Sequence, residues 1–149
     1  MLTLKSVTRI PTPAYHCAFT SLCHYQGTTY LAYRQAQSHN PYPPGHIVIQ
    51  RSADLETWEV AASLRTGGDD RDPHLIATDD GLYCLFGTYV PGYDVWTGRL
   101  SLSGSDLATY AVRSQDGSAW GPPYRVGRVG SWIWSCVEDT VPPDEPGLL

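Results

Sequence analysis

An eight-residue pattern that occurs twice is the feature of this sequence that most restricts its fold. The pattern is Arg-Ser-x-Asp-[Leu/Gly]-x-x-Trp, and its two copies span 51–58 and 113–120. A short apolar run precedes each copy, and an extended, β-prone segment follows it. Ser and Asp side chains can hydrogen-bond nearby backbone amides and hold a chain reversal, while the Trp ring packs under the turn. The repeat therefore predicts two equivalent strand–turn–strand units.

The rest of the chain extends each unit to a four-stranded antiparallel meander. Aligning the units on Gly27 and Gly81 places Ala18 opposite Asp72. We expect an all-β fold, a partial β-propeller of four-stranded antiparallel blades with two blades plus the first strand of a third. A sandwich of two such sheets is the alternative that periodicity leaves open. The expected parts are an N-terminal lead-in over 1–14, blade one over 15–66, blade two over 67–128, the first strand of blade three over 129–137 and an acidic, Pro-rich tail over 138–149.

Charge and hydropathy exclude several classes of partner. The net charge is −5 and there is no Lys/Arg run, which argues against nucleic acid. No stretch approaches the roughly 18 apolar residues of a membrane span, and the first residues lack the apolar core of a signal peptide, so we expect a cytoplasmic protein. The four Cys form no C-x-x-C knuckle, so neither a metal site nor a cofactor is expected.

Two blades do not close a propeller, which needs roughly four to eight. The exposed sides could be covered by a homo-oligomer, or the chain could be a truncated piece of a longer protein. The tail over 138–149, with its prolines and acids, favours truncation.

Strand order places the long connections of both units at one end. The Ser-x-Asp turns share an end with the Gly27 and Gly81 turns, while the loops 34–45 and 90–106 and the blade-to-blade segments gather at the opposite end. Long loops at one end of a rigid scaffold are where ligand sites are built. We therefore expect the functional site at the end that carries the long loops.

Arg71 and Asp72, within an acidic run that enters the second unit, are the strongest candidates for chemistry at this end. Glycoside hydrolysis needs carboxylates beside the scissile bond, and a guanidinium can bind or orient one. A solvated salt bridge in a loop is the alternative reading of such a run. Polar and aromatic residues at the same end suit a sugar, and the further candidates for substrate binding are Arg34, His39, His46, Asp70, Tyr93, Asp94, Trp96 and Trp134. Trp132 and Trp134 share strand parity, which places them on one face.

A set of residues in the first unit consists of Phe19, Gly27, the run Tyr30–Arg34 and the run from His46 to Trp58. This set resembles the opening blade of bacterial sialidase-like propellers, and its Ser-x-Asp turn matches the Asp-box (BNR) repeat of that family. Many of its members are labelled exo-α-sialidases, so the resemblance implies a propeller that cleaves glycosides. The expected substrate is then a glycan or a small sugar.

A second resemblance concerns Arg71-Asp72-Pro73 followed by Asp80-Gly81. This arrangement is similar to the five-bladed furanosidase clan of invertases and arabinanases, in which the Asp of this motif stabilises the transition state. The resemblance implies that role, or that of an acid, for Asp72, with Arg71 binding an anionic or hydroxyl group.

The departures from both families limit the expected activity. Ala18-Phe19 stands where the furanosidases have their nucleophile or base, and Trp134-Ser135-Cys136 stands where they have their acid. The segment 35–45 contains no Asp to serve as the sialidase acid. We expect a sialidase-like glycoside hydrolase propeller that is truncated and weakly active or inactive. A non-catalytic carbohydrate-binding or interaction module, or a furanosidase-type glycosidase, is the alternative.

Overall fold

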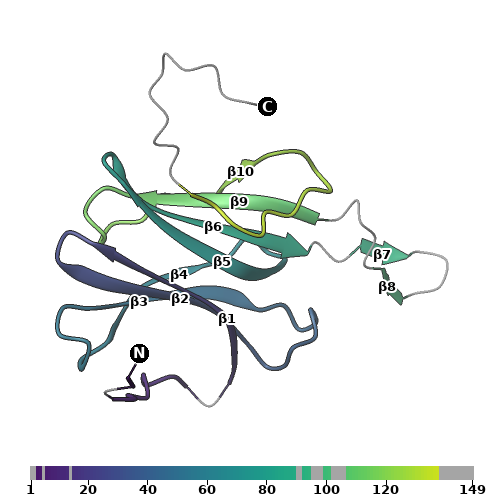
Figure 1. Cartoon of the computed structure of the whole chain (residues 1–149). Helices are drawn as coiled ribbons and strands as arrows, with labels where there is room; N and C mark the ends of the chain where they lie inside the picture. Colours follow the sequence, from purple (N-terminus) through teal and green to yellow (C-terminus); the bar gives the residue numbers. More distant parts are fainter. Residues whose placement is uncertain are drawn as a thin grey trace.

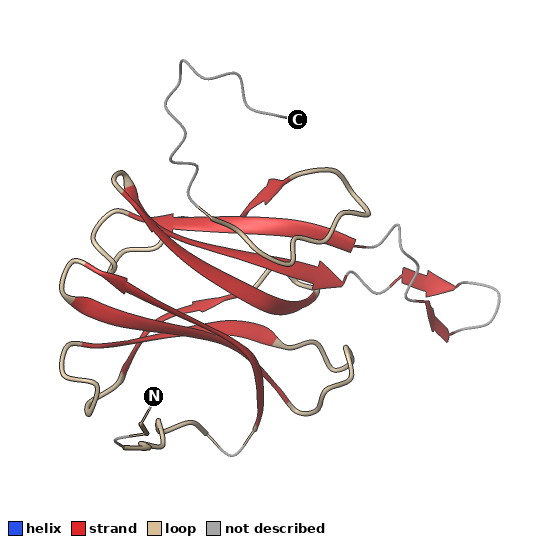
Figure 2. Cartoon of the chain, viewed as in Figure 1, coloured by secondary structure: helices blue, strands red, loops and turns tan. Residues whose placement is uncertain are grey.

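A computed structural model describes residues 3–4, 6–13, 15–89, 92–94, 99–101 and 107–137, the segments 92–94 and 99–101 by their backbone alone. In these residues the chain is built of strands joined by turns and loops, as Figure 2 shows. No helix long and apolar enough to cross a membrane occurs among them. The predicted all-β class is confirmed.

The first sheet is the predicted meander. Its strands pair antiparallel in chain order, and they are β1 (His16–Tyr25), β2 (Thr28–Ala36), β3 (His46–Ser52) and β4 (Glu59–Leu64). The hairpin between β1 and β2 turns on Gln26 and Gly27, both with positive φ (48° and 79°). Two consecutive residues with positive φ match the right-handed twist of the strands that they join.

The second sheet repeats the same order. Its strands are β5 (Asp69–Thr78), β6 (Gly81–Tyr89), β9 (Leu107–Ser114) and β10 (Tyr124–Val126), with β7 (Gly92–Asp94) and β8 (Arg99–Ser101) forming a separate two-stranded ladder. Residues 131–137 join no ladder with another described strand. A first strand of a third blade needs a second strand to pair with, so that element stays a prediction.

A single apolar layer between the two sheets holds them together. Tyr30, Ile47 and Ile49 on the first sheet pack against Leu82 and Phe86 on the second, and all five are buried. Burying a side chain of this size contributes on the order of 1.5–3 kcal/mol. The inner strands β1 and β5 lie beside each other, as Figure 1 shows, and the Ser21 hydroxyl accepts the Leu75 N–H across them (2.9 Å).

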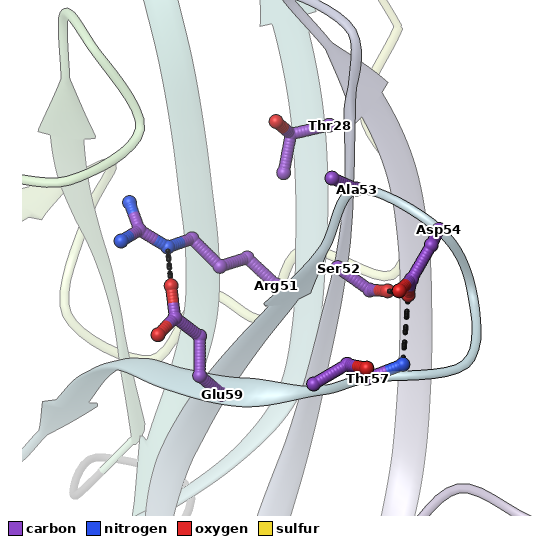
Figure 3. Close-up of a pocket in the computed structure, with 7 residues that line it drawn as sticks. All are labelled: Thr28, Arg51, Ser52, Ala53, Asp54, Thr57 and Glu59. Carbon is purple, nitrogen blue, oxygen red and sulfur yellow. Dashed lines mark hydrogen bonds and ion pairs between the residues drawn. The ribbon is translucent and has the colours of Figure 1, made fainter.

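The Ser-x-Asp turns are closed by the hydrogen bonds that the sequence predicts. The Asp54 carboxylate accepts the N–H groups of Glu56 (2.9 Å) and Thr57 (2.7 Å) and the Ser52 hydroxyl (3.0 Å). Figure 3 shows Ser52, Asp54 and Thr57 converging in this way. In the second sheet the Asp116 carboxylate closes the equivalent turn. The two copies therefore use one set of contacts.

We expect the Asp54 turn to make stability depend on pH at the acid end. The N–H groups of Thr57 and Glu56 and the Ser52 hydroxyl lower the pKa of Asp54 to about 2. A depressed pKa in the folded state stabilises the fold above the ordinary Asp value of about 3.9. That stabilisation is lost as the pH falls toward 2. Urea unfolding of wild type and Asp54→Asn should therefore give midpoints that differ at pH 5 and converge by pH 2. A difference that stays constant across this range would contradict the assignment.

All four tight turns lie at one end of the molecule, on the left in Figure 1, and the loop after β2 lies at the other. At the turn end the second sheet reaches across to the first. The Tyr25 hydroxyl donates to the Gln115 carbonyl (2.8 Å), and Arg51 Nη1 donates to the Ser118 hydroxyl (2.5 Å). The two Ser-x-Asp turns thus lie together, as a propeller requires.

A β-bulge interrupts each inner strand near the loop end. In β1 the register shifts between Ala18 and Ser21, and in β5 it shifts between Arg71 and His74. The bulges carry the positive-φ residues Phe19 (59°) and Asp72 (51°). The counterpart of Asp72 is therefore Phe19, and the alignment that placed Ala18 there is wrong by one residue.

Candidate functional site

A pocket of about 510 Å³ opens at the loop end, where the inner strands begin. The two bulge residues, an arginine, a leucine and four other aromatic or imidazole side chains surround it. Its lining consists of Phe19, His39, Arg71, Asp72, Tyr89, Leu107, Trp132 and Trp134. The two bulges explain why the pocket forms here, because a positive φ turns a side chain away from the regular alternation of the strand.

Asp72 is positioned by a tryptophan from the end of the described chain. Its Oδ2 accepts a hydrogen bond from Trp132 Nε1 (3.0 Å). The Trp132 ring packs against Gly87, where an added Cβ would overlap it. Tyr89 and Trp134 flank that ring, with centroids 5.0 Å and 6.2 Å away. Asp72 Oδ1 accepts no hydrogen bond from the described residues, so it can accept one from a ligand.

Arg71 also lines the pocket, and part of its guanidinium is already hydrogen-bonded within the protein. Its Nε donates to Asp69 Oδ2 (2.7 Å), and its Nη2 donates to the same oxygen and to the His39 carbonyl (3.3 Å). The guanidinium also lies over the rings of Phe19 (5.6 Å) and Tyr89 (5.0 Å). Cation–π contacts on two rings hold it in place.

Asp69 links Arg71 to a second arginine behind the pocket. Its Oδ1 accepts from Arg34 Nη2 (2.6 Å) and Nε (3.1 Å) and from the Gly45 N–H (2.6 Å). Arg34 and Asp69 both have side chains with 0% exposure. Arg34 also donates to the carbonyls of Ser38 and Asn40 (2.9 Å each), so it fastens the loop after β2 to the scaffold.

Asp70 points away from this ion network and is also fully buried. It accepts hydrogen bonds from the Thr66 N–H (3.0 Å), the Thr66 hydroxyl (2.5 Å) and the Thr88 hydroxyl (2.7 Å). Burial raises the pKa of Asp70, and the hydrogen bonds oppose that rise. These hydrogen bonds tie the connection between β4 and β5, which contains Thr66, to β6, which contains Thr88. Asp70 therefore has a structural role.

The structure places the predicted site residues in three groups. His39, Arg71, Asp72 and Trp134 line the pocket, whereas Arg34 and Asp70 lie behind it in structural bonds. His46 lies in a separate pocket of about 230 Å³ beside Arg65, where burial and then the Arg65 charge lower its pKa. The side chains of Tyr93 and Asp94, and the whole of Trp96, lie outside the described residues.

Three lining residues were not predicted from the sequence, namely Phe19, Tyr89 and Leu107. Aligning the units one residue further along would have identified Phe19, because it then stands opposite Asp72. Trp132 and Trp134 both line the pocket, with ring centroids 6.2 Å apart, although residues 131–137 form no strand for the parity argument to act on. Within the described ranges no group of three or more His, Cys, Asp or Glu side chains could hold a metal ion.

Comparison with solved structures identifies the fold. The chain is similar to Trypanosoma rangeli sialidase (TM-score 0.55, 17% identity) over 75% of its own length and 21% of that chain. It matches the same sialidase in complex with sialic acid (0.53, 19%) over 75% of its length and 20% of that chain. It also matches a mutant of that sialidase displaying trans-sialidase activity (0.53, 19%) over 73% and 20%. No family model matches the chain, and no curated protein matches it significantly.

The fold is a partial β-propeller. Both four-stranded sheets have the order of propeller blades, and their neighbours in solved structures are sialidases at low identity. The chain spans about a fifth of the length of those sialidases. Within this partial propeller, the pocket lies where the innermost strands β1 and β5 of both blades begin, at the end where Figure 1 places the loop after β2.

Proposed function

We propose that the pocket binds a sugar residue of a glycan and belongs to a propeller of the sialidase-like glycosidase type. One observation carries the proposal: the pocket joins a carboxylate and a guanidinium to the rings of Phe19, Tyr89 and Trp132. Small-molecule sites of this kind combine an apolar lining with a few placed polar groups. The C–H faces of a sugar stack on these aromatic rings, and the hydroxyls of the sugar form hydrogen bonds with Asp72 and Arg71.

In hydrolysis Asp72 would face the positive charge that develops at the anomeric carbon. A carboxylate fixed by the Trp132 N–H is suited to that electrostatic task, because it is oriented before the reaction begins. Glycosidases use two carboxyl groups beside the scissile bond. Among the described residues Asp72 supplies the single carboxylate of the pocket lining. The proposal therefore expects sugar binding by this chain with little turnover.

A non-catalytic carbohydrate-binding module is the second candidate, and the same single carboxylate favours it. The furanosidase reading stays a hypothesis that rests on the Arg71-Asp72-Pro73 motif. Assays on aryl sialosides and aryl arabinofuranosides distinguish the three readings. Cleavage of one of these substrates that Asp72→Asn abolishes would assign a hydrolase; sugar binding without cleavage would assign the binding module.

We expect saturable binding of a simple methyl glycoside in a titration followed by NMR. Trp134→Ala should weaken binding by about fivefold or more, since an aromatic stacking contact is lost. Trp134 is 74% exposed, so its removal leaves the fold intact. Tyr124→Ala is the matched control, because Tyr124 is an exposed aromatic residue that lines no part of this pocket. Equal losses for both variants, or none for either, would contradict the site.

A further inference from the structure

Both arginines near the pocket have their carboxylate-binding edges occupied by the protein itself. An arginine clamps a carboxylate through two parallel N–H groups on neighbouring nitrogens, drawn from its five donors. In Arg71 the Nε and Nη2 pair is used on Asp69, and Nη2 donates again to the His39 carbonyl. Nη1 is then the Arg71 nitrogen that has no hydrogen-bond partner among the described residues. Because the clamp on a carboxylate needs N–H groups on two neighbouring nitrogens, Nη1 alone cannot form it.

Arg34 is even less available. Its Nε and Nη2 donate to Asp69, its Nη1 donates to Ser38 and its Nη2 donates also to Asn40. Its side chain has no exposed surface. It therefore supplies charge from behind the wall but no hydrogen bond to a ligand.

The charges around the pocket also cancel. Arg34 and Arg71 carry two positive charges, and Asp69 and Asp72 carry two negative charges. Asp70, behind the wall, can make the region only more negative. An anionic ligand would have to give up its hydration without a net positive field to replace it, and its charge would face the Asp72 carboxylate.

From these contacts we infer that the pocket selects neutral sugars over sugars that carry a carboxylate. This inference rests on the proposed sugar-binding function and specifies its ligand class. Asp72 Oδ1 accepts one hydroxyl, Arg71 Nη1 donates to one oxygen, and the rings of Phe19, Tyr89 and Trp132 receive the apolar face. That set of groups suits a polyol ring and leaves a carboxylate without a partner. Sialic acid, which one of the similar sialidase structures contains, belongs to the disfavoured class.

Matched pairs of ligands test the inference. Each pair consists of a methyl hexoside and its methyl hexuronide, in the gluco and galacto series, so that the two members differ only in CH₂OH against COO⁻ at C6. Free sialic acid joins the panel. Dissociation constants are measured by NMR titration of the whole chain at pH 8, which limits the contribution of protonated histidine. We expect each uronide to bind at least about tenfold more weakly than its neutral partner.

Asp72→Asn is the informative variant. Asn accepts a positive φ well, so the bulge keeps its conformation, and its amide oxygen can still accept the Trp132 N–H. Removing the negative charge should reduce the discrimination within each pair to less than about threefold. A preference that persists unchanged in Asp72→Asn would overturn the role that we give to the Asp72 charge.

The remaining outcomes separate this inference from the proposed function. Uronides or sialic acid that bind wild type as tightly as the neutral sugars would overturn the inference while sugar binding stands. If no member of the panel binds, the proposed function itself fails and the inference falls with it. If only the neutral sugars bind wild type, and the affinity difference between neutral sugar and uronide is smaller in Asp72→Asn, the result supports both the proposed function and this inference.

Discussion

Asp69→Asn should destabilise the protein by about 3 kcal/mol or more. The Asp69 carboxylate is fully buried and pairs with both Arg34 and Arg71. Removing one member of a buried ion network leaves the charges of the others uncompensated, which is why the effect exceeds that of a surface pair. An amide at this position would also turn an N–H group toward arginine or backbone donors. The free energy of unfolding in urea, followed by far-UV circular dichroism, measures the loss.

Glu59→Gln is the matched control for that substitution. Glu59 pairs with Arg51 at 2.7 Å, but 66% of its side chain is exposed, so the change should alter stability by less than about 1 kcal/mol. Figure 3 shows this pair beside the Asp54 turn. In 1 M salt the Glu59 effect should shrink, because exposed charges are screened, while the Asp69 effect persists. A loss below about 1 kcal/mol for Asp69→Asn would show that Asp69 does not bridge the two arginines.

Gly117→Ala should be the second strongly destabilising substitution, by about 2–4 kcal/mol. Gly117 lies in the second Ser-x-Asp turn with φ of 72°, and an added Cβ would overlap the hydroxyl of Tyr30 on the first sheet. Two effects combine here, the strain of a left-handed residue with a side chain and the collision with the neighbouring sheet. Thermal and urea unfolding give the total.

Gly127→Ala separates the two effects. Gly127 has a similar φ of 74°, but nothing lies within 4 Å of the position that an added Cβ would take, so only the strain of about 1–2 kcal/mol applies. The double variant Gly117→Ala/Tyr30→Phe removes the nearest atom of the collision and should recover part of the loss. Equal destabilisation by the two glycine substitutions would rule out a tight contact between the sheets at this turn.

The turns could be predicted from the sequence because their contacts are local. Ser52, Asp54 and the amides that they bind lie within a few residues, and the second copy at Ser114 and Asp116 repeats them. The fifth position of the repeated pattern is Leu in one copy and Gly in the other. Both residues, Leu55 and Gly117, have the positive φ that the turn requires at this position. Repetition of such local bonds also predicted the order of the strands.

The pocket could be predicted only in part, because its decisive contacts are not local. A solvated salt bridge in a loop was the alternative interpretation of the run that begins at Asp69, yet Asp69 and Asp70 lie in β5 and are fully buried. The reason is Arg34, which stands 35 positions earlier in the chain and meets Asp69 only in the folded protein. Aligning the units on Gly27 and Gly81 also failed, since Gly27 belongs to a turn and Gly81 begins a strand.

The paired bulges at Phe19 and Asp72 have a consequence for how such a protein can evolve. Each sheet carries the same backbone irregularity, and each copy projects a side chain into a shared space. One of these side chains is aromatic and the other is acidic, while the strands on either side of each bulge pair in the same way. The two bulges thus offer two independently adjustable positions, so a ligand preference can be changed by exchanging a single residue without redesigning the framework.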